Sequence, residues 1–347
     1  MSAGLVLITG ATGLIGYSVV VEALRSGYSV RAAVRSQAKA DRILATKPIK
    51  ELWSSNPVAN LSFVFVPDIL ADGAYDEAVQ GVQFVIHLAS PVPNQNLIED
   101  FETQLIQPAV KGTTGILTSA LKTTGIKRIV ITSSTGGIVS FHDLIGFGTG
   151  KTFDGDHRVP ADNGPYAHVM QAYAASKVKA LLATDEFFAN NKTEFDHVNI
   201  MPSFVLGRND LATTPEEIAS SSNGVLMRLV LGHDAPMPLP GTTVHLEDVA
   251  KMHVLSLDSA KVAGGSNFVA TSGGLEGIQF NDYQEIVNRR FPSTIENGRL
   301  PNNGTLTTKS LKLDASKAET VFGFKFQGYE EQVVSVVRQY LEILGSS

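Results

Sequence analysis

The glycine-rich turn close to the start of the chain constrains the fold more than any other feature. Residues 5–8 are apolar, and glycines follow at positions 10, 13 and 16. A short apolar run that ends in turn residues predicts a buried parallel strand, and the amphipathic segment 14–25 predicts a helix. Glycine lets the backbone bend tightly and approach a ligand, and the helix N-terminus offers free N–H groups to an anion. The stretch therefore predicts a dinucleotide-binding turn.

These glycines have the spacing Gly-x-x-Gly-x-x-Gly, which is less common than Gly-x-Gly-x-x-Gly. Because the chain has 31 glycines, such a triplet also fits an ordinary loop. Its place on the first predicted strand, turn and helix favours phosphate binding. The residues of this turn that we expect to contact the cofactor are Thr9, Gly10, Thr12, Gly13, Leu14 and Ile15.

Arg35 indicates which nicotinamide cofactor the turn binds. It ends the second predicted strand, residues 28–35, at a place where NAD-binding folds usually carry a carboxylate for the ribose 2′-hydroxyl. A carboxylate would repel a 2′-phosphate, whereas a guanidinium pairs with one through two hydrogen bonds. The alternative is a solvated arginine at a strand end. We expect NADP(H) as the cofactor.

Strands and helices alternate through the N-terminal part of the chain. Strands are predicted at 61–66, 84–88 and 128–132, and a long helix is predicted at 101–123. Such βαβ units form a parallel sheet with helices on both faces and a ligand crevice at the carboxyl ends of the strands. The predicted fold class is α/β: a Rossmann doubly wound parallel sheet with a smaller C-terminal substrate-binding region.

Residues at the tips of the third and fourth strands are further candidates for cofactor binding. Asp68 follows the third strand and either reaches the adenine or caps the turn, and Ile69 comes next. Small residues after the fourth strand let a cofactor lie against the backbone. The contacts expected there are Leu88, Ala89 and Ser90.

The predicted domains follow the same pattern. Residues 1–202 and 241–262 form the dinucleotide-binding Rossmann domain, and residues 203–240 and 263–347 form the substrate-binding region. The first part of that region is rich in Asn, Ser, Thr, Pro and Gly, which suits mobile loops around a pocket. The apolar residues 225–231 predict a short helix that either lines a hydrophobic pocket or packs in the core.

Ser134, Tyr173 and Lys177 are the candidate catalytic residues. Ser134 follows the fifth strand, and Tyr173 and Lys177 lie four residues apart on a helix predicted to run over 173–190. Each feature alone is weak evidence, because strand-end serines usually form turns and a Tyr–Lys pair at this spacing arises by chance. Combined with the nucleotide turn, the three side chains can converge in one crevice.

The chemistry of these three groups suits carbonyl reduction. A phenol has an unperturbed pKa of about 10, and a neighbouring ammonium, helped by a positive nicotinamide, lowers that pKa by favouring the phenolate. Ser134 can donate a hydrogen bond to the carbonyl oxygen as it gains charge. Tyr173 delivers the proton, and the nicotinamide supplies the hydride.

The segments TGATGLIG, TSSTGG, YAASK and PSFVLG resemble the extended short-chain dehydrogenase/reductase family, and the resemblance covers nearly the whole chain. The most similar branch is the dihydroflavonol 4-reductase-like group, which includes fungal aldehyde and ketone reductases. The resemblance implies Ser134 as the catalytic serine, with Ser133 as a fallback, and Lys177 as a ligand of the nicotinamide ribose. It also implies that Arg35 and Lys39 bind the 2′-phosphate.

The same resemblance places the segment with Pro202, Ser203 and Val205 beside the nicotinamide. Two stretches depart from the family pattern. The Asn-Trp-Tyr signature of plant cinnamoyl-CoA reductases is missing before Tyr173, which disfavours a CoA thioester substrate. Residues 47–60, rich in Pro, Ser and Asn, resemble a longer surface loop than the family usually has there.

Composition disfavours several other classes. The net charge is −6 and no run of Lys or Arg occurs, which argues against nucleic acid or an anionic membrane as partner. The chain has no cysteine, and its eight histidines show no metal-ligand spacing, so no metal is expected. No apolar run approaches membrane-spanning length and no signal-peptide pattern opens the chain, so we expect a cytoplasmic protein.

The predicted function is an NADPH-dependent carbonyl reductase that converts a small apolar ketone or aldehyde to an alcohol, as a monomer or homodimer. One alternative is a nucleotide-sugar epimerase or dehydratase of the same superfamily, which usually keeps NAD and has an acidic residue where Arg35 stands. The other is a non-catalytic NADP-sensing regulator, which the intact set of Ser134, Tyr173 and Lys177 disfavours.

Overall fold

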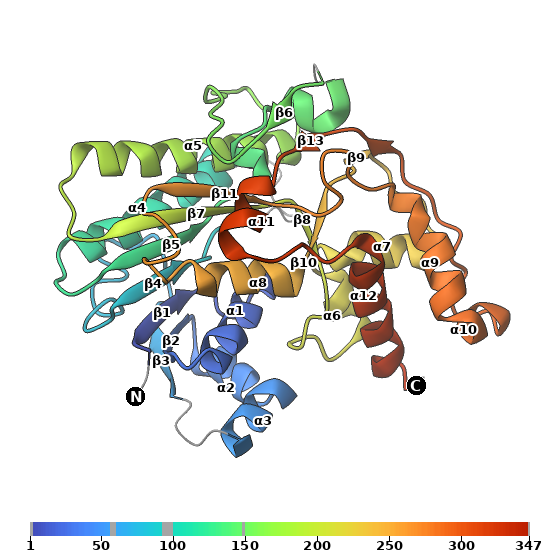
Figure 1. The fold of residues 1–347 in the computed structure, drawn as a ribbon, viewed down its shortest axis with the longest axis horizontal. Helices are drawn as coiled ribbons and strands as arrows, with labels where there is room; N and C mark the ends of the chain where they lie inside the picture. The colour runs from blue at the N-terminus through green and yellow to red at the C-terminus, as the bar shows by residue number, and fades with distance from the viewer. Residues whose placement is uncertain (1–2, 56–59, 92–99, 148–149, 346–347) are drawn as a thin grey trace. The chain divides into compact units, whose positions relative to one another are not determined.

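The chain divides into two compact units in the computed structural model, which describes residues 3–55, 60–91, 100–147 and 150–345 (Figure 1). The first unit contains Met1–Phe141, Gly155–Met201 and Ala250–Phe268. The second contains His142–Asp154, Pro202–Val249 and Val269–Ser347. The assignment of cofactor binding and substrate binding to separate domains stays a prediction.

A seven-stranded parallel sheet forms the centre of the fold. Its order is β3-β2-β1-β4-β5-β7-β11. After β3, at one edge, the chain returns to the middle of the sheet, where β4 pairs with β1 on the side opposite β2. This order confirms the predicted Rossmann fold and puts the topological switch point at the carboxyl ends of β1 and β4. The strands are β1 (Leu5–Thr9), β2 (Ser29–Val34), β3 (Leu61–Phe65), β4 (Phe84–His87), β5 (Arg128–Thr132), β7 (Asp196–Pro202) and β11 (Ser266–Ala270).

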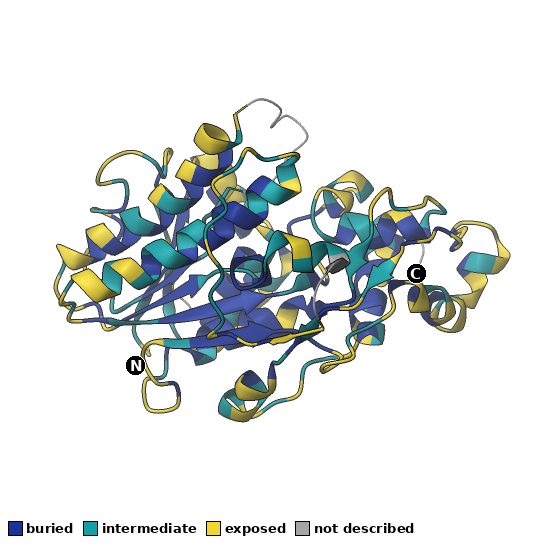
Figure 2. Cartoon of the chain, turned by 90° about the horizontal axis from the view of Figure 1, so that it is seen from above, coloured by how far each residue is buried: buried dark blue, intermediate teal, exposed yellow. Residues whose placement is uncertain are grey.

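Helices cover both faces of this sheet, with α4 and α5 on one face and α1 on the other (Figure 1). Strands covered on both sides are apolar along their whole length, and Val6, Leu7 and Ile8 of β1 are fully buried. Figure 2 shows the same pattern, with a buried sheet between helices that expose their outer sides. The helices are α1 (Leu14–Arg25), α2 (Gln37–Leu44), α3 (Lys47–Ser55), α4 (Gln107–Leu121), which follows a π-helical turn at Glu102–Ile106, and α5 (Val169–Asn190).

Helix α3 corrects the prediction of a surface loop over residues 47–60. Residues Lys47–Ser55 are helical, and Ile49 is fully buried. Pro48 lies in the first turn, where its missing N–H costs no helical hydrogen bond, so a proline there does not exclude a helix. The polar composition reflects the exposed side of a short amphipathic helix. The last part of the predicted loop, residues 56–59, lies outside the described residues.

The second unit is built mainly from short helices packed around an apolar core. Leu226, Leu229 and Val230 of α7 are fully buried in that core, so α7 packs in the core, which is one of the two roles expected for residues 225–231. Helix α8 (Leu246–Leu255) begins in this unit and ends in the first. The other helices are α6 (Pro215–Ala219), α7 (Asn223–Val230), α9 (Tyr283–Arg290), α10 (Pro292–Glu296), α11 (Ser316–Phe322) and α12 (Tyr329–Ile343).

Three pairs of short parallel strands complete the second unit. They are β8 (Phe204–Leu206) with β10 (Thr243–His245), β9 (Leu239–Pro240) with β12 (Thr308–Lys309), and β6 (Thr152–Phe153) with β13 (Lys312–Leu313). Each pair joins stretches far apart in the sequence. They were not predicted, because two- or three-residue strands leave no periodic pattern.

Candidate active site

The predicted nucleotide turn joins β1 to α1 through a left-handed residue, Gly10. Its φ is +67°, and a Cβ there would lie 2.8 Å from the backbone nitrogen of Ala89. A Cβ on Gly16 would lie only 2.1 Å from the carbonyl oxygen of Gly10. Gly10 is therefore required for its backbone conformation and for the approach of the β4 tip, and Gly16 is required for the packing of α1 on the turn.

The first turn of α1 has no side-chain cap. Its N-cap residue is Gly13, which is exposed, and Thr12, Leu14 and Ile15 are partly exposed. The first N–H groups of a helix have no intrahelical acceptor. Together with the positive end of the helix dipole, they form a site suited to a phosphate.

Thr9 and His87 connect the tips of β1 and β4, where the two residues are paired in register. The Thr9 hydroxyl accepts hydrogen bonds from the N–H groups of Leu88 and Ala89, each at 3.1 Å. Its own proton is therefore donated to Nδ1 of His87, 2.9 Å away, which makes His87 a neutral ring protonated on Nε2. Burial lowers the pKa of His87 to about 3, and the charge of Lys177 acts in the same direction.

His87 is not among the residues predicted from the sequence. A single polar residue that ends a strand of buried apolar residues was the available signal. Its Nε2 is buried and has no hydrogen-bond partner in the described part of the chain. The hydrogen bond of His87 to Thr9 thus joins the tips of β1 and β4 at the topological switch point of the sheet.

Arg35 and Lys39 lie beyond the carboxyl end of β2, at and near the start of α2. Both are exposed, and within the described ranges neither side chain has a hydrogen-bond or ion-pair partner. The Arg35 charge acts on Tyr75, whose pKa is raised by burial and lowered to a lesser extent by that charge. Two cations therefore remain available here for an anionic group.

Asp68 caps the turn that follows β3. Its Oδ1 accepts a hydrogen bond from the N–H of Leu70 at 2.8 Å, and the side chain is exposed. This is one of the two roles expected for it, and a contact with adenine stays a prediction. Ile69 is half-buried and packs against the apolar core of the first unit, which leaves part of its side chain accessible.

Tyr173 and Lys177 lie one turn apart on α5. The helix begins at Val169 rather than at Tyr173, because His168 caps it: Nδ1 of His168 accepts the N–H of Gln171 at 3.4 Å. Histidine is not among the favoured N-cap residues, so the residue type does not predict a helix start there. Tyr173 is therefore inside the helix, where its neighbours hold it more firmly than an end residue.

The Lys177 ammonium is the centre of the contacts at this site. Lys177 is only 7% exposed. Its Nζ lies 5.3 Å from the centroid of the Tyr173 ring and donates a hydrogen bond to Oγ of Ser90 at 2.8 Å. The structure thus brings together three predicted residues from α5 and from the loop after β4.

Ser134 lies after β5 and caps a single 3-10 turn, Thr135–Gly137. Its Oγ accepts the N–H of Gly136 at 3.1 Å, which leaves the hydroxyl proton free to be donated. The turn packs closely on α5: a Cβ on Gly137 would lie 3.2 Å from the carbonyl oxygen of Lys177 and 3.1 Å from Oγ of Ser133. Ser134 is therefore positioned by the same helix that carries Tyr173 and Lys177.

Pro202, Ser203 and Val205 belong to the second unit. Pro202 ends β7, the N–H of Ser203 donates to the carbonyl oxygen of Ala270 at 2.9 Å, and Val205 is buried in β8. The carbonyl oxygen of Val205 accepts a hydrogen bond from the Ser222 hydroxyl. Their position beside a nicotinamide stays a prediction.

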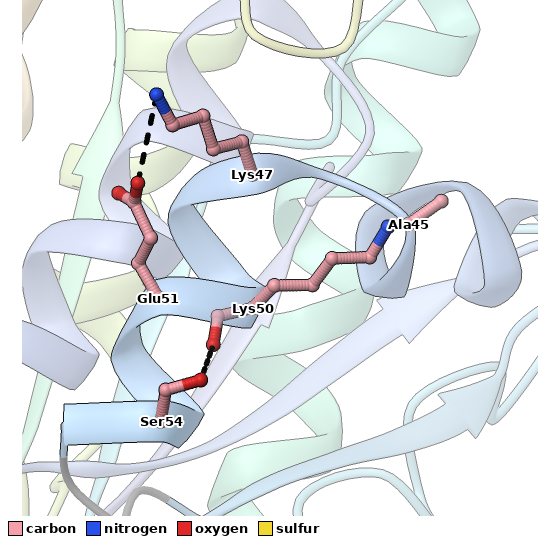
Figure 3. Close-up of a pocket in the computed structure, with 5 residues that line it drawn as sticks. All are labelled: Ala45, Lys47, Lys50, Glu51 and Ser54. Carbon is pink, nitrogen blue, oxygen red and sulfur yellow. Dashed lines mark hydrogen bonds and ion pairs between the residues drawn. The ribbon is translucent and has the colours of Figure 1, made fainter.

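An open pocket of about 460 Å³ lies along α3 (Figure 3). It contains none of the predicted site residues. Lys47 pairs with Glu51 at 3.6 Å, and the backbone carbonyl oxygen of Lys50 accepts the Ser54 hydroxyl at 3.0 Å. We therefore do not include this pocket in the site. Its lining residues are Ala45, Lys47, Lys50, Glu51 and Ser54.

The described residues contain no cluster of three or more His, Cys, Asp or Glu side chains arranged to hold a metal ion. None of their helices combines the length and the apolar character needed to cross a membrane.

Comparison with known proteins gives a consistent result. Residues 6–270 match the NAD dependent epimerase/dehydratase family. The chain is 40% identical to ketoreductase CTB6 of Cercospora beticola, over 99% of this chain and 96% of that protein. It is 38% identical to NAD-dependent epimerase/dehydratase ALT6 of Alternaria alternata, over 98% of both. The crystal structure of yeast methylglyoxal/isovaleraldehyde reductase Gre2 complexed with NADPH superposes with a TM-score of 0.77 at 25% identity, covering 99% of this chain and 100% of that one.

Proposed function

This chain belongs to the NAD dependent epimerase/dehydratase family, and from that premise we propose that it is an NADPH-dependent carbonyl reductase acting on a small apolar ketone or aldehyde. The observation that carries the proposal is the Lys177 ammonium, held between the Tyr173 ring and the Ser90 hydroxyl. A relative named ketoreductase and an NADPH-bound reductase of the same fold support it.

The residues of the first unit fit a dinucleotide. The backbone around Gly10 and Gly16 packs too closely for a Cβ, which fixes the start of α1 against the turn, and the uncapped start of α1 supplies N–H donors that suit a pyrophosphate. Arg35 and Lys39 have no anionic partner within the described ranges. They suit a ribose 2′-phosphate, which supports NADPH over NADH. NADPH, when bound, supplies the hydride to the carbonyl carbon.

Ser134, Tyr173 and Lys177 then stabilise the charge and supply the proton at the carbonyl oxygen. Ser134 donates its free hydroxyl proton in a hydrogen bond to that oxygen, which stabilises the negative charge as it develops. Tyr173 gives its phenolic proton to the same oxygen and completes the alcohol. The Lys177 ammonium, beside the ring of Tyr173, stabilises the phenolate that remains until water returns a proton.

The proposal is tested by following the oxidation of NADPH with a panel of aryl ketones, α-keto esters and aldehydes, and NADH in parallel. We expect turnover with NADPH and little with NADH. Equal use of NADH would leave the reaction class standing and contradict the role of Arg35. Tight cofactor binding without turnover of any carbonyl would instead favour a nucleotide-sugar epimerase or dehydratase, or a sensor of NADP.

A further inference from the structure

We infer that Ser90 is a positioning residue that holds the Lys177 ammonium against Tyr173 before any carbonyl binds. The inference deepens the proposed function and rests on it. Ser90 is thereby given a role beyond the direct cofactor contact predicted for it.

The position of Ser90 is fixed by its neighbours. The Thr9 hydroxyl holds the N–H groups of both Leu88 and Ala89, and a Cβ on Gly10 would collide with Ala89. Ser90 therefore follows two residues whose backbone is held by hydrogen bonds. The same turn that suits the cofactor sets the place of the Ser90 hydroxyl.

The ammonium depends on this hydroxyl because it has little access to water. Lys177 is 7% exposed. A nearly buried cation that loses its hydrogen-bond acceptor costs free energy unless it finds another acceptor or water. The flexible lysine stem allows Nζ to turn toward solvent, and that movement takes it away from the Tyr173 ring.

The Ser90 hydroxyl can serve the lysine and a ligand together. Its oxygen accepts from Nζ, and its own proton remains available to donate, so a bound ribose need not displace the lysine. A purely cofactor-binding serine and a lysine-positioning serine therefore predict different losses on substitution. The first weakens NADPH binding, and the second weakens the acid on Tyr173.

The test compares Ser90→Ala with Ser90→Thr, which restores a hydroxyl, and with Ser54→Ala, which removes an exposed hydroxyl on α3. For Ser90→Ala we expect kcat to fall about 10-fold, less than the roughly 10²–10⁴-fold of a complete loss of positioned proton transfer. Kd for NADPH should rise by a smaller factor than kcat falls, because Lys177 is also the expected ligand of the nicotinamide ribose. The alkaline limb of kcat/KM should move to higher pH, because a phenol without a nearby cation ionises less readily. Ser90→Thr should recover most of kcat, and Ser54→Ala should match the parent.

A second readout needs no turnover. Tyrosinate absorbance of the cofactor-free protein is titrated in the parent and in Tyr173→Phe, and their difference isolates Tyr173. In the Ser90→Ala background this difference curve should have its midpoint at higher pH. An unchanged midpoint and alkaline limb, with Kd for NADPH raised 10-fold or more, would overturn the positioning role and leave only a cofactor contact.

The two proposals fail in distinguishable ways. If the parent oxidises no NADPH with any carbonyl, the proposed function fails, while the tyrosinate titration still reports on the Ser90–Lys177 contact. If the parent turns over and Ser90→Ala retains the parental kcat and alkaline limb, the positioning role fails alone. A thermal unfolding curve shared by the parent and Ser90→Ala excludes general unfolding as the cause of a loss.

Discussion

Arg35 and Ser134 of the first unit use their polar groups in the opposite way to Asn223 and Tyr283 of the second. At the strand ends of the first unit, Arg35 has no partner in the described residues and Ser134 keeps a free hydroxyl proton. In the second unit, Asn223 is fully buried and forms two hydrogen bonds with the backbone of Gly207. The Tyr283 hydroxyl shares its one proton between the carbonyl oxygens of Leu229 and Gly304. The two candidate site residues keep spare hydrogen-bond donors, whereas Asn223 and Tyr283 donate to the backbone of their own unit.

This difference explains why the sequence offers candidate site residues in the first unit and no candidate substrate contacts in the second. In the first unit the candidate groups lie at fixed offsets from strand ends, which a sequence displays directly. In the second unit the contacts join α7 to segments far away in the chain, such as Gly304 to Leu229. No local pattern reveals such pairs.

Tyr173→Phe tests the proposed proton donor of the first unit and carries the largest expected effect. We expect turnover to fall by roughly 10²–10⁴, because the proton donor of the first unit is lost, while the affinity for NADPH is nearly unchanged. Tyr340→Phe, on α12 of the second unit, is the matched control and should retain parental turnover. A Tyr173→Phe enzyme with full activity on every substrate of the parent would contradict the mechanism.

The glycine turn gives the next largest effect. Gly16→Ala places a Cβ 2.1 Å from a backbone oxygen, so we expect a loss of about 3 kcal/mol in the free energy of unfolding and weaker NADPH binding. Gly115→Ala, on α4, has nothing within 4 Å of the added Cβ and should stabilise the protein by up to about 1 kcal/mol. Denaturant unfolding of both variants checks this, and equal stabilities would refute the packing argument.

Asn223→Ala tests whether a buried polar group of the second unit serves stability alone. The N–H and carbonyl oxygen of Gly207 would lose partners at 3.1 and 2.6 Å, so we expect the free energy of unfolding to fall by about 2 kcal/mol. The affinity for NADPH should change little, since the bonds serve the second unit internally. A large loss of cofactor affinity at unchanged stability would show that this polar group is not merely structural.

Arg35→Ser carries the smallest expected effect. Removing one charged partner of a phosphate should weaken NADPH binding by about 10-fold and leave NADH binding unchanged. Arg25→Ser removes an exposed arginine from the last turn of α1 and serves as control. Fluorescence titration with both nucleotides gives the ratio, and an equal loss for NADH and NADPH would remove the basis for the preference.

Several parts of the fold were predictable because their signals are local. The strand after residue 4 and the helix Leu14–Arg25 follow from an apolar run and a periodic pattern on either side of glycines. The parallel sheet with helices on both faces follows from the alternation of strands and helices. Such signals need no knowledge of distant residues.

The failures have equally specific causes. The sequence of α3 resembles a loop because Pro48 and two serines are typical of turns, although the burial of Ile49 decides the structure. The start of α5 was placed too late because His168 is an unusual cap. His87 was missed because its partner, Thr9, is distant in the sequence and becomes its neighbour only through the pairing of β1 with β4.

The central claim is that the side chains around Lys177 reduce a carbonyl at the expense of NADPH. The most direct measurement compares the NADPH oxidised with the alcohol formed from one accepted ketone, in the parent and in Tyr173→Phe. We expect one alcohol for each NADPH oxidised in the parent, and almost no alcohol in the variant. A parent that consumes no NADPH, or that converts its substrate without net oxidation of the cofactor, would contradict the claim.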